Sequence, residues 1–95
     1  MRTNSVILTD AAISVLLTKP LSKAESIALW WLVANLPVAG DVISLASLAE
    51  ALKVPRARLS QTIKRLCEIG FLVRGTKIAL SYHYKLNPVF IRILS

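Results

Sequence analysis

The sequence predicts an α+β fold, mainly α-helical with one small β-hairpin. Two patterns indicate this class. Residues 45–52 and 59–66 place apolar side chains at the spacing of one helix face, whereas residues 78–86 alternate apolar and polar side chains with a period of two. The chain has 95 residues, which fits one domain, since domains typically contain about 100–150 residues. We therefore expect a single domain over residues 1–95.

Composition excludes several classes of protein. The hydrophobic fraction of 55% is too high for a disordered basic tail. A single cysteine, Cys67, excludes an intramolecular disulfide and a cysteine zinc site, and a lone thiol suits a reducing compartment, so we expect a cytoplasmic protein. The longest uncharged stretch, residues 26–40, is shorter than the ~20 apolar residues of a transmembrane helix. We expect no membrane span and no targeting segment.

Two helices are predicted in the first half of the chain. Thr9 precedes residues 11–18 as a helix cap. Ser22 and Glu25, three residues apart, form a capping box at the start of a longer helix over residues 21–36. This second helix is apolar nearly all round, so we expect it to be buried on both sides.

A helix-turn-helix is predicted next, over about residues 45–70. Residues 42–43 are a short strand candidate, and Ser44 caps the helix that follows. Residues 53–55 form a tight turn, Pro55 suits the start of the next helix, and Gly70 suits its end.

A hairpin follows over about residues 71–87. The sequence predicts strands at 71–73 and 78–86, joined by a turn at 74–77. The Asn-Pro pair that follows can then cap a short apolar helix over residues 89–94.

The positive charge is concentrated in one half of the chain. Residues 1–52 carry three Lys or Arg against four Asp or Glu, a net charge of −1, whereas residues 53–95 carry nine against one, a net charge of +8. A segment that is both basic and structured is typical of a polyanion-binding surface, most often one for nucleic acid. The alternative is a charged solubility surface, although such surfaces usually mix both signs.

The order helix, short turn, helix, hairpin is that of a winged helix-turn-helix. Residues 47–74, SLAEALKVPRARLSQTIKRLCEIGFLVR, resemble the core of bacterial winged-helix DNA-binding proteins of the MarR-like group. Residues 84–88, YKLNP, are similar to a segment of RepL-type plasmid replication proteins. Two positions depart from the pattern: Lys53 stands where Gly is usual, and Pro55 where a capping Ser or Thr is usual.

The resemblance implies that the second helix of the motif enters the major groove of DNA, which is wide enough for an α-helix. Three groups of residues then form the predicted contacts. Base edges are contacted from the helix, phosphates from its flank and from the start of the preceding helix, and the adjacent backbone or minor groove from the hairpin tip. The predicted base contacts are Arg56, Arg58, Ser60, Gln61 and Lys64. The predicted phosphate contacts are Arg65, Ser44 and Ser47, and the predicted contacts of the hairpin are Arg74 and Lys77. The alternative is a solvated helix face and a charged hairpin tip.

The other notable side chains are assigned to packing. Trp30 and Trp31 fit the core or a dimer interface better than a ligand cage. Cys67 flanks the apolar face of its helix and is expected to pack as a small hydrophobe. Tyr82 and Tyr84 share the apolar face of the hairpin, so we expect both to be buried. An ion pair between Glu68 and Lys64 is expected at i, i+4 spacing.

The sequence therefore predicts a sequence-specific protein that binds double-stranded DNA as a homodimer and regulates transcription or plasmid replication and maintenance. The dimer surface is expected to come from residues 6–17, 21–36 and 90–94. The alternative is a winged-helix protein-interaction module in a larger assembly, with non-specific nucleic-acid binding. No paired carboxylates near a His, phosphate loop or activated nucleophile can be found, so no enzyme, cofactor, metal site or small-molecule substrate is expected.

Overall fold

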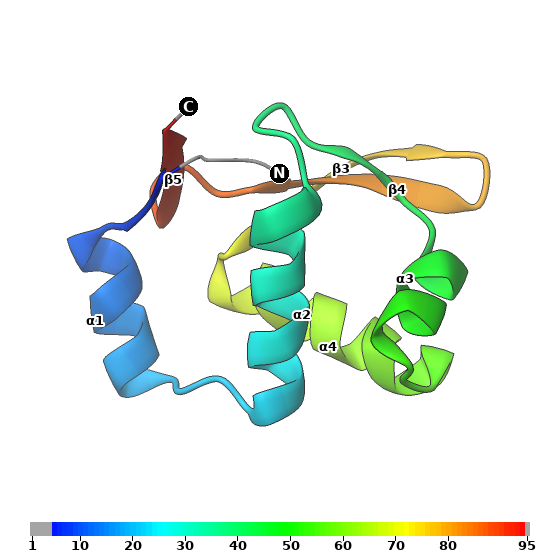
Figure 1. Cartoon of the computed structure of the whole chain (residues 1–95), viewed down its shortest axis with the longest axis horizontal. Helices are drawn as coiled ribbons and strands as arrows, with labels where there is room; N and C mark the ends of the chain where they lie inside the picture. Colours follow the sequence, from blue (N-terminus) through cyan, green and yellow to red (C-terminus); the bar gives the residue numbers. More distant parts are fainter. Residues whose placement is uncertain (1–4, 95) are drawn as a thin grey trace.

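Four helices and two small antiparallel sheets make up residues 5–94, the part of the chain that the computed structural model describes (Figure 1). The α+β class that the sequence predicts is confirmed. In chain order the elements are β1 (Ser5–Leu8), α1 (Asp10–Thr18), α2 (Lys23–Asn35), β2 (Asp41–Ile43), α3 (Leu45–Leu52), α4 (Arg56–Ile69), β3 (Leu72–Ile78), β4 (Ser81–Leu86) and β5 (Ile91–Leu94).

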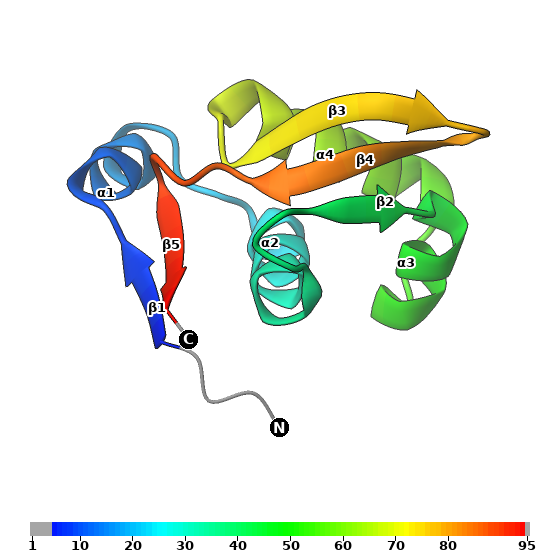
Figure 2. The ribbon, with the colours of Figure 1, turned by 90° about the horizontal axis from the view of Figure 1, so that it is seen from above.

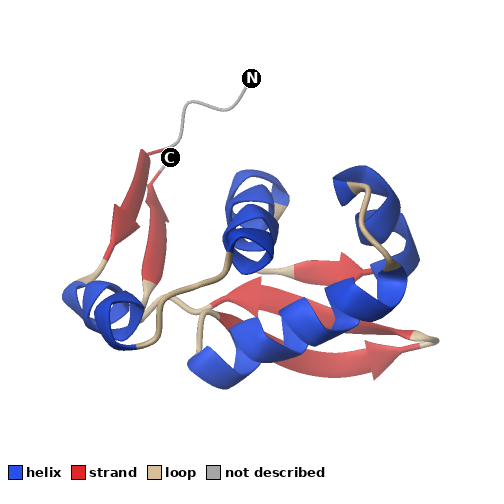
Figure 3. Cartoon of the chain, turned by 90° about the horizontal axis from the view of Figure 1, so that it is seen from below, coloured by secondary structure: helices blue, strands red, loops and turns tan. Residues whose placement is uncertain are grey.

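The larger sheet has the strand order β2-β4-β3, with both pairs antiparallel. Helix α4 crosses one face of this sheet (Figure 3). The smaller sheet is a ribbon of β1 and β5, which lies with α1 at the end of the molecule opposite the tip of the β3–β4 hairpin (Figures 1 and 2). This arrangement is compatible with the winged helix that the sequence predicts. No helix within residues 5–94 is long and apolar enough to cross a membrane.

The core is formed mainly between α2, α4 and the segment that follows α4. The largest fully buried side chains are Leu29 and Leu32 of α2, Leu59 and Leu66 of α4, and Phe71. Since α2 and α4 form the centre of this core, the direction of the exposed face of α4 is set by its packing on α2.

The helix ends follow the predicted capping. The Thr9 side chain accepts a hydrogen bond from the backbone at the start of α1. Ser22 and Glu25 form the capping box of α2, with both of its hydrogen bonds present. The Ser44 side chain accepts a hydrogen bond at the start of α3, and Gly70 ends α4 in the left-handed conformation, at φ 109°. The starts of α1, α2 and α3 and the end of α4 are thus set by short-range hydrogen bonds or by glycine.

The turn between α3 and α4 has the two unusual residues that the sequence indicates. Lys53 takes a left-handed conformation with φ 55°, in which its backbone N–H donates to the carbonyl groups of Ala49 and Glu50. Pro55 precedes α4 as its cap residue, with no side-chain hydrogen bond. The turn is therefore closed by the backbone alone, and α4 begins one residue later than a helix with Pro55 in its first turn would.

The end of α4 is joined to the hairpin by a compact set of contacts. The backbone N–H groups of Gly70 and Phe71 both donate to the Leu66 carbonyl. The Asn87 side-chain amide donates to the Gly70 carbonyl over 2.9 Å, and the Asn87 backbone N–H donates to the Phe71 carbonyl. Phe71 meets the edge of Phe90, with the ring centroids 5.1 Å apart. These contacts fix the hairpin relative to α4.

The predicted helix over residues 89–94 is wrong. Ile91–Leu94 is the strand β5, which pairs antiparallel with β1, so that Val6 lies opposite Ile93 and Leu8 opposite Ile91. A helix of so few residues gains too few hydrogen bonds to offset the conformational entropy that its first turn costs. A strand at the same position forms backbone hydrogen bonds with β1 instead. The strand β1 was not predicted, because a four-residue apolar run has no period that separates strand from helix.

The predicted division of the hairpin is also wrong. Strand β3 extends through the expected turn at 74–77 to Ile78, and the turn lies at residues 79–80. The ladder shifts register between Arg74 and Lys77, which marks a β-bulge around Gly75. A glycine inside a strand pattern commonly marks such a bulge, so Gly75 belongs to the strand rather than to its end.

Replacing Asn87 with alanine should destabilise the fold by about 1–3 kcal/mol, because it leaves the partly buried Gly70 carbonyl at the end of α4 without its hydrogen-bond donor. Urea unfolding monitored by circular dichroism measures this loss. The matched control is Asn35→Ala, which removes an exposed hydrogen bond from Asn35 to the Trp31 carbonyl. An equal loss in both variants would contradict the role of Asn87 at this junction.

Candidate nucleic-acid interface

Helix α4 presents a polar face opposite its buried one. Leu59, Thr62, Ile63 and Leu66 are buried, and the Thr62 hydroxyl is satisfied because it donates to the Arg58 carbonyl over 3.0 Å. The predicted contact residues of this helix are all exposed: Arg56, Arg58, Ser60, Gln61, Lys64 and Arg65. The structure divides them between the two flanks of the exposed face.

One flank faces the hairpin across a groove of about 1130 Å³. Arg56, Ser60 and Lys64 line it from α4, Ser44 lines it from the start of α3, and Arg74 lines it from β3. Five of the predicted contact residues, from three separate elements, therefore line one groove. The charged residues of its lining are three cations, Arg56, Lys64 and Arg74, and one carboxylate, Glu68. This excess of positive charge favours an anionic ligand.

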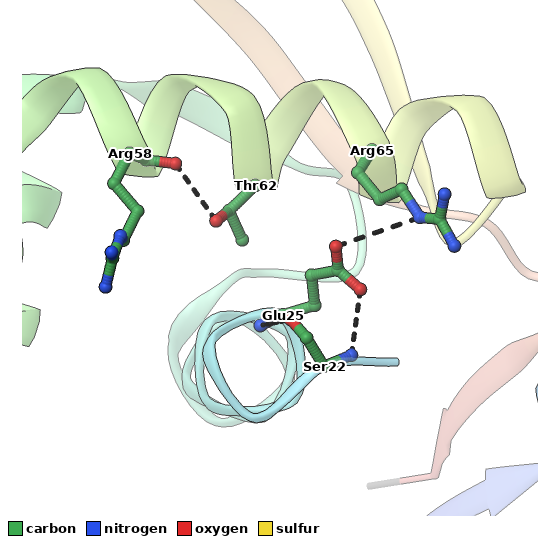
Figure 4. A network of polar contacts seen from close by, with 5 residues as sticks. All are labelled: Ser22, Glu25, Arg58, Thr62 and Arg65. Carbon is green, nitrogen blue, oxygen red and sulfur yellow. Dashed lines mark hydrogen bonds and ion pairs between the residues drawn. The ribbon is translucent and has the colours of Figure 1, made fainter. Parts of the chain in front are cut away.

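The other flank faces the start of α2 (Figure 4). Arg58, Gln61 and Arg65 line a smaller hollow there, next to Ser22 and Glu25. Glu25 accepts a hydrogen bond from the Ser22 backbone N–H over 2.9 Å, and its second carboxylate oxygen lies 3.7 Å from Nε of Arg65. Arg65 is therefore directed toward α2, although its side chain remains 46% exposed. An exposed pair of this kind contributes about 1 kcal/mol at most.

The predicted ion pair between Glu68 and Lys64 does not form: among residues 5–94 the ion pair is the one between Arg65 and Glu25. Both Glu68 and Lys64 line the groove instead. Their i, i+4 spacing permits a contact, but an exposed pair gains too little to hold two long side chains in one geometry.

Ser44 and Ser47 have different environments. The Ser44 oxygen accepts the Ser47 backbone N–H as the cap of α3, which leaves the Ser44 O–H as a donor at the edge of the groove. Ser47 lines another hollow, with Trp31 and Leu36. Ser47 is exposed but does not line the groove shared by α4 and the hairpin.

Arg74 and Lys77 lie in β3 rather than at the hairpin tip, which corrects their predicted position. The bulge explains how they act together. In a regular strand, side chains three positions apart point to opposite faces. Here Arg74 pairs with Tyr84 and Lys77 with Tyr82, so three steps along β3 match two steps along β4. The extra residue brings both cations to the same face of the hairpin.

Both cations lie against one aromatic ring. The Arg74 guanidinium carbon is 4.7 Å from the Tyr82 ring centroid, and Nζ of Lys77 is 5.7 Å from it. Tyr82 in turn meets the edge of Tyr84, with the centroids 6.4 Å apart. Tyr84 is buried as predicted, but Tyr82 is only half-buried and lines the groove. Cation–π contacts of this kind orient the charged groups while leaving their N–H donors free.

The hairpin tip is apolar. It consists of Ala79, with a left-handed φ of 56°, and Leu80, which is 92% exposed. Both residues line the end of the groove that Arg56 and Lys64 also line. The tip therefore differs from the charged turn that the sequence predicts.

Burial controls the chemistry of the one cysteine. The Cys67 side chain is half-buried beside the groove, and desolvation raises the pKa of its thiol, with Arg74 lowering it and Glu68 raising it to smaller extents. The thiol is therefore protonated at neutral pH and a poor nucleophile. Burial also raises the pKa of Tyr84. Both observations agree with packing roles for these two side chains.

Within the described part of the chain, no three His, Cys, Asp or Glu side chains lie close enough together to hold a metal ion. The sequence matches no protein-family model, and no curated protein matches it significantly.

Two residues of the groove were missed at the sequence level, Tyr82 and Leu80. The period of two places Tyr82 on an apolar face, and this pattern does not indicate that Arg74 and Lys77 lie against its ring. The same pattern places Leu80 on the apolar face of a strand over residues 78–86, so it does not indicate that this side chain is exposed. Gly75 is the residue that could have indicated both positions. A glycine inside a strand pattern often marks a bulge, and a bulge at Gly75 would extend the strand and move the turn toward residues 79–80.

Proposed function

We propose that the chain is a winged helix-turn-helix protein that binds double-stranded DNA, with α4 in the major groove and the β3–β4 hairpin as its wing. The observation that carries this proposal is the groove between α4 and the hairpin, whose lining has three cations and one carboxylate. The element order β2-α3-α4-β3-β4, with β4 between β2 and β3 in the sheet, supports it.

The outermost side of α4 and its two flanks have different roles in this binding mode. Ala57, Gln61 and Lys64 share the outermost side of the helix, by its 100° turn per residue, and Gln and Lys are suited to base edges. Arg56 and Ser60 flank them on the hairpin side, and Arg58 and Arg65 on the side of α2. Cations at the flanks of a helix in the major groove lie nearest the two phosphate backbones, which they would bind without reading sequence.

The biological role that we propose is occupancy of a DNA site, which would regulate transcription or plasmid replication and maintenance. The first role follows the resemblance of residues 47–74 to MarR-like proteins, and the second follows the YKLNP segment at 84–88. The side-chain amide of Asn87 in that segment donates a hydrogen bond to the Gly70 carbonyl at the end of α4, so Asn87 stabilises the fold whichever role applies.

The proposed active form is a homodimer. Apolar side chains are exposed at the end of the molecule that carries β1, β5 and α1, among them Val6, Ile7, Ile13 and Leu17 at 45%, 43%, 45% and 79%. On α2, Ile27 and Trp30 are also exposed, three positions apart on one side of the helix. Exposed apolar clusters commonly mark protein interfaces. Two copies joined there would present two α4 helices to half-sites about 34 Å apart.

The alternative function is a protein-interaction module whose basic groove binds nucleic acid only non-specifically. The exposed apolar side chains favour a different protein partner as much as a second copy of the chain. The two proposed functions therefore differ in whether the groove binds DNA sequence-specifically or only non-specifically.

Removing two groove cations, in Arg56→Ala/Lys64→Ala, should weaken duplex binding by about 1–3 kcal/mol for each lost contact and reduce the salt dependence by about one to two counterions. Fluorescence anisotropy of a labelled duplex at several salt concentrations measures both quantities. The matched control, Lys19→Ala/Lys85→Ala, removes the same net charge from exposed positions outside the groove and outside the proposed dimer surface. If both variants bind equally, the groove is not the DNA site.

The charge change Leu17→Glu should convert a dimer to a monomer, because a carboxylate at the centre of an apolar interface loses its hydration. Analytical ultracentrifugation at tens of micromolar measures the change. Leu80→Glu, at the 92% exposed leucine of the hairpin tip, is the control and should remain dimeric. Wild-type protein that sediments as a monomer would contradict the proposed dimer.

A further inference from the structure

The exposed leucine at the hairpin tip has no role in the folded chain. Leu80 is 92% exposed, the highest exposed fraction among the large hydrophobic side chains of residues 6–93. Its neighbours in the turn region, Ile78 and Ala79, are also exposed. Two-residue hairpin turns favour Asn and Gly, because these residues accept a positive φ easily, yet Ala79 takes φ 56° here. Neither burial nor turn geometry therefore accounts for the residues at this position.

Positive charge lies directly behind the tip. The bulge at Gly75 turns Lys77 to the same face as Arg74, and both cations lie over the Tyr82 ring. Leu80 follows Lys77 by three residues and lines the same groove as Arg56 and Lys64 of α4. An apolar side chain thus projects from a basic stem, on the side of the hairpin where α4 exposes its own cations.

With α4 in a major groove, as proposed, the hairpin tip would face a minor groove. The two grooves alternate along the duplex, so a hairpin that projects beside the helix would extend over the neighbouring minor groove. The minor groove of B-DNA is about 6 Å wide, whereas two paired strands alone are about 5 Å apart before their side chains are added. The hairpin backbone would therefore remain at the mouth of the groove, and a single tip side chain would enter it.

We propose that Leu80 is an apolar wedge that enters the minor groove next to the major-groove site of α4, opens a base step and bends the DNA. Apolar side chains at such positions partly unstack a base step and kink the duplex. Arg74 and Lys77 hold the flanking phosphates from the Tyr82 ring, which keeps the stem in place as the duplex bends. The inference deepens the proposed function and depends on it.

The wedge also has a consequence for sequence preference. A leucine side chain has no hydrogen-bonding groups, so it cannot distinguish bases by their edges. It responds instead to how easily a step opens, and pyrimidine–purine steps such as TA and CA open most easily. The tip would therefore select a flexible step beside the bases that α4 contacts. An apolar protein pocket fits the tip less well, because the groove behind it is lined by three cations and one carboxylate and favours an anionic partner.

The experiment uses the full chain and a duplex of about 30 base pairs rich in TA steps, with a donor and an acceptor dye at its two ends and 2-aminopurine at the central step. Anisotropy reports binding, energy transfer reports the end-to-end distance, and 2-aminopurine emission reports unstacking in the same sample. We expect wild-type protein to raise both energy transfer and 2-aminopurine emission at saturation.

Leu80→Ala should fold normally, because the side chain is exposed, and should still bind the duplex with an affinity lowered by roughly tenfold at most. At saturation it should lose most of the rise in both signals. The matched control is Val38→Ala, at a 69% exposed valine between α2 and β2 that lies outside the groove and outside the proposed dimer surface, and it should behave as wild type. Melting temperatures of both variants establish that they are folded.

Each contrary outcome has a distinct meaning. Wild-type binding without bending, or equal bending by Leu80→Ala, overturns the wedge and leaves the proposed DNA binding in place. Absence of any duplex binding by wild type overturns the proposed function, and the wedge with it. Loss of self-association in Leu80→Ala, measured by sedimentation, would assign the tip to a contact between copies and would also overturn the wedge.

Discussion

The relation between α4 and the hairpin depends on one junction, where the helix ends and the first strand of the hairpin begins. Gly70 reverses the chain with a positive φ, and the next residue, Phe71, is fully buried. A Cβ at Gly70 would lie 2.8 Å from the Phe90 ring, so no larger residue fits without displacing that ring. Asn87 then binds the Gly70 carbonyl from the end of the hairpin. The start and the end of the hairpin are therefore both attached to the last turn of α4.

This junction gives the groove its fixed walls. The hairpin is held at its base, so its free end projects past the start of α4 and past α3, where the positive charge of α4 begins (Figures 1 and 3). The bulge at Gly75 adds the local rotation that brings Arg74 and Lys77 to one face. The position of the groove thus follows from the chain reversal at Gly70 and from the bulge in β3, whereas its positive charge comes from Arg56, Lys64 and Arg74.

Local signals predicted the helices well, and long-range pairing could not be predicted. Ser22 with Glu25, Ser44 and Gly70 mark helix ends through contacts within a few residues, and those ends are confirmed. The ribbon of β1 and β5 joins segments more than eighty residues apart, for example Val6 with Ile93, and nothing in either short apolar run indicates the other. The same limit applies to the groove, since the cations of α4 were predicted but the bulge that directs Arg74 and Lys77 toward Tyr82 was not.

The central claim is that the groove between α4 and the hairpin binds duplex DNA and selects its sequence. Selection from a pool of random duplexes, with enriched and unenriched sequences compared at about 50 and 200 mM salt, tests it most directly. The proposed dimer would select an inverted repeat that remains tightly bound at the higher salt, because base contacts do not depend on counterion release. An unenriched pool whose binding is lost at the higher salt would contradict the claim and would leave the groove as a non-specific polyanion surface.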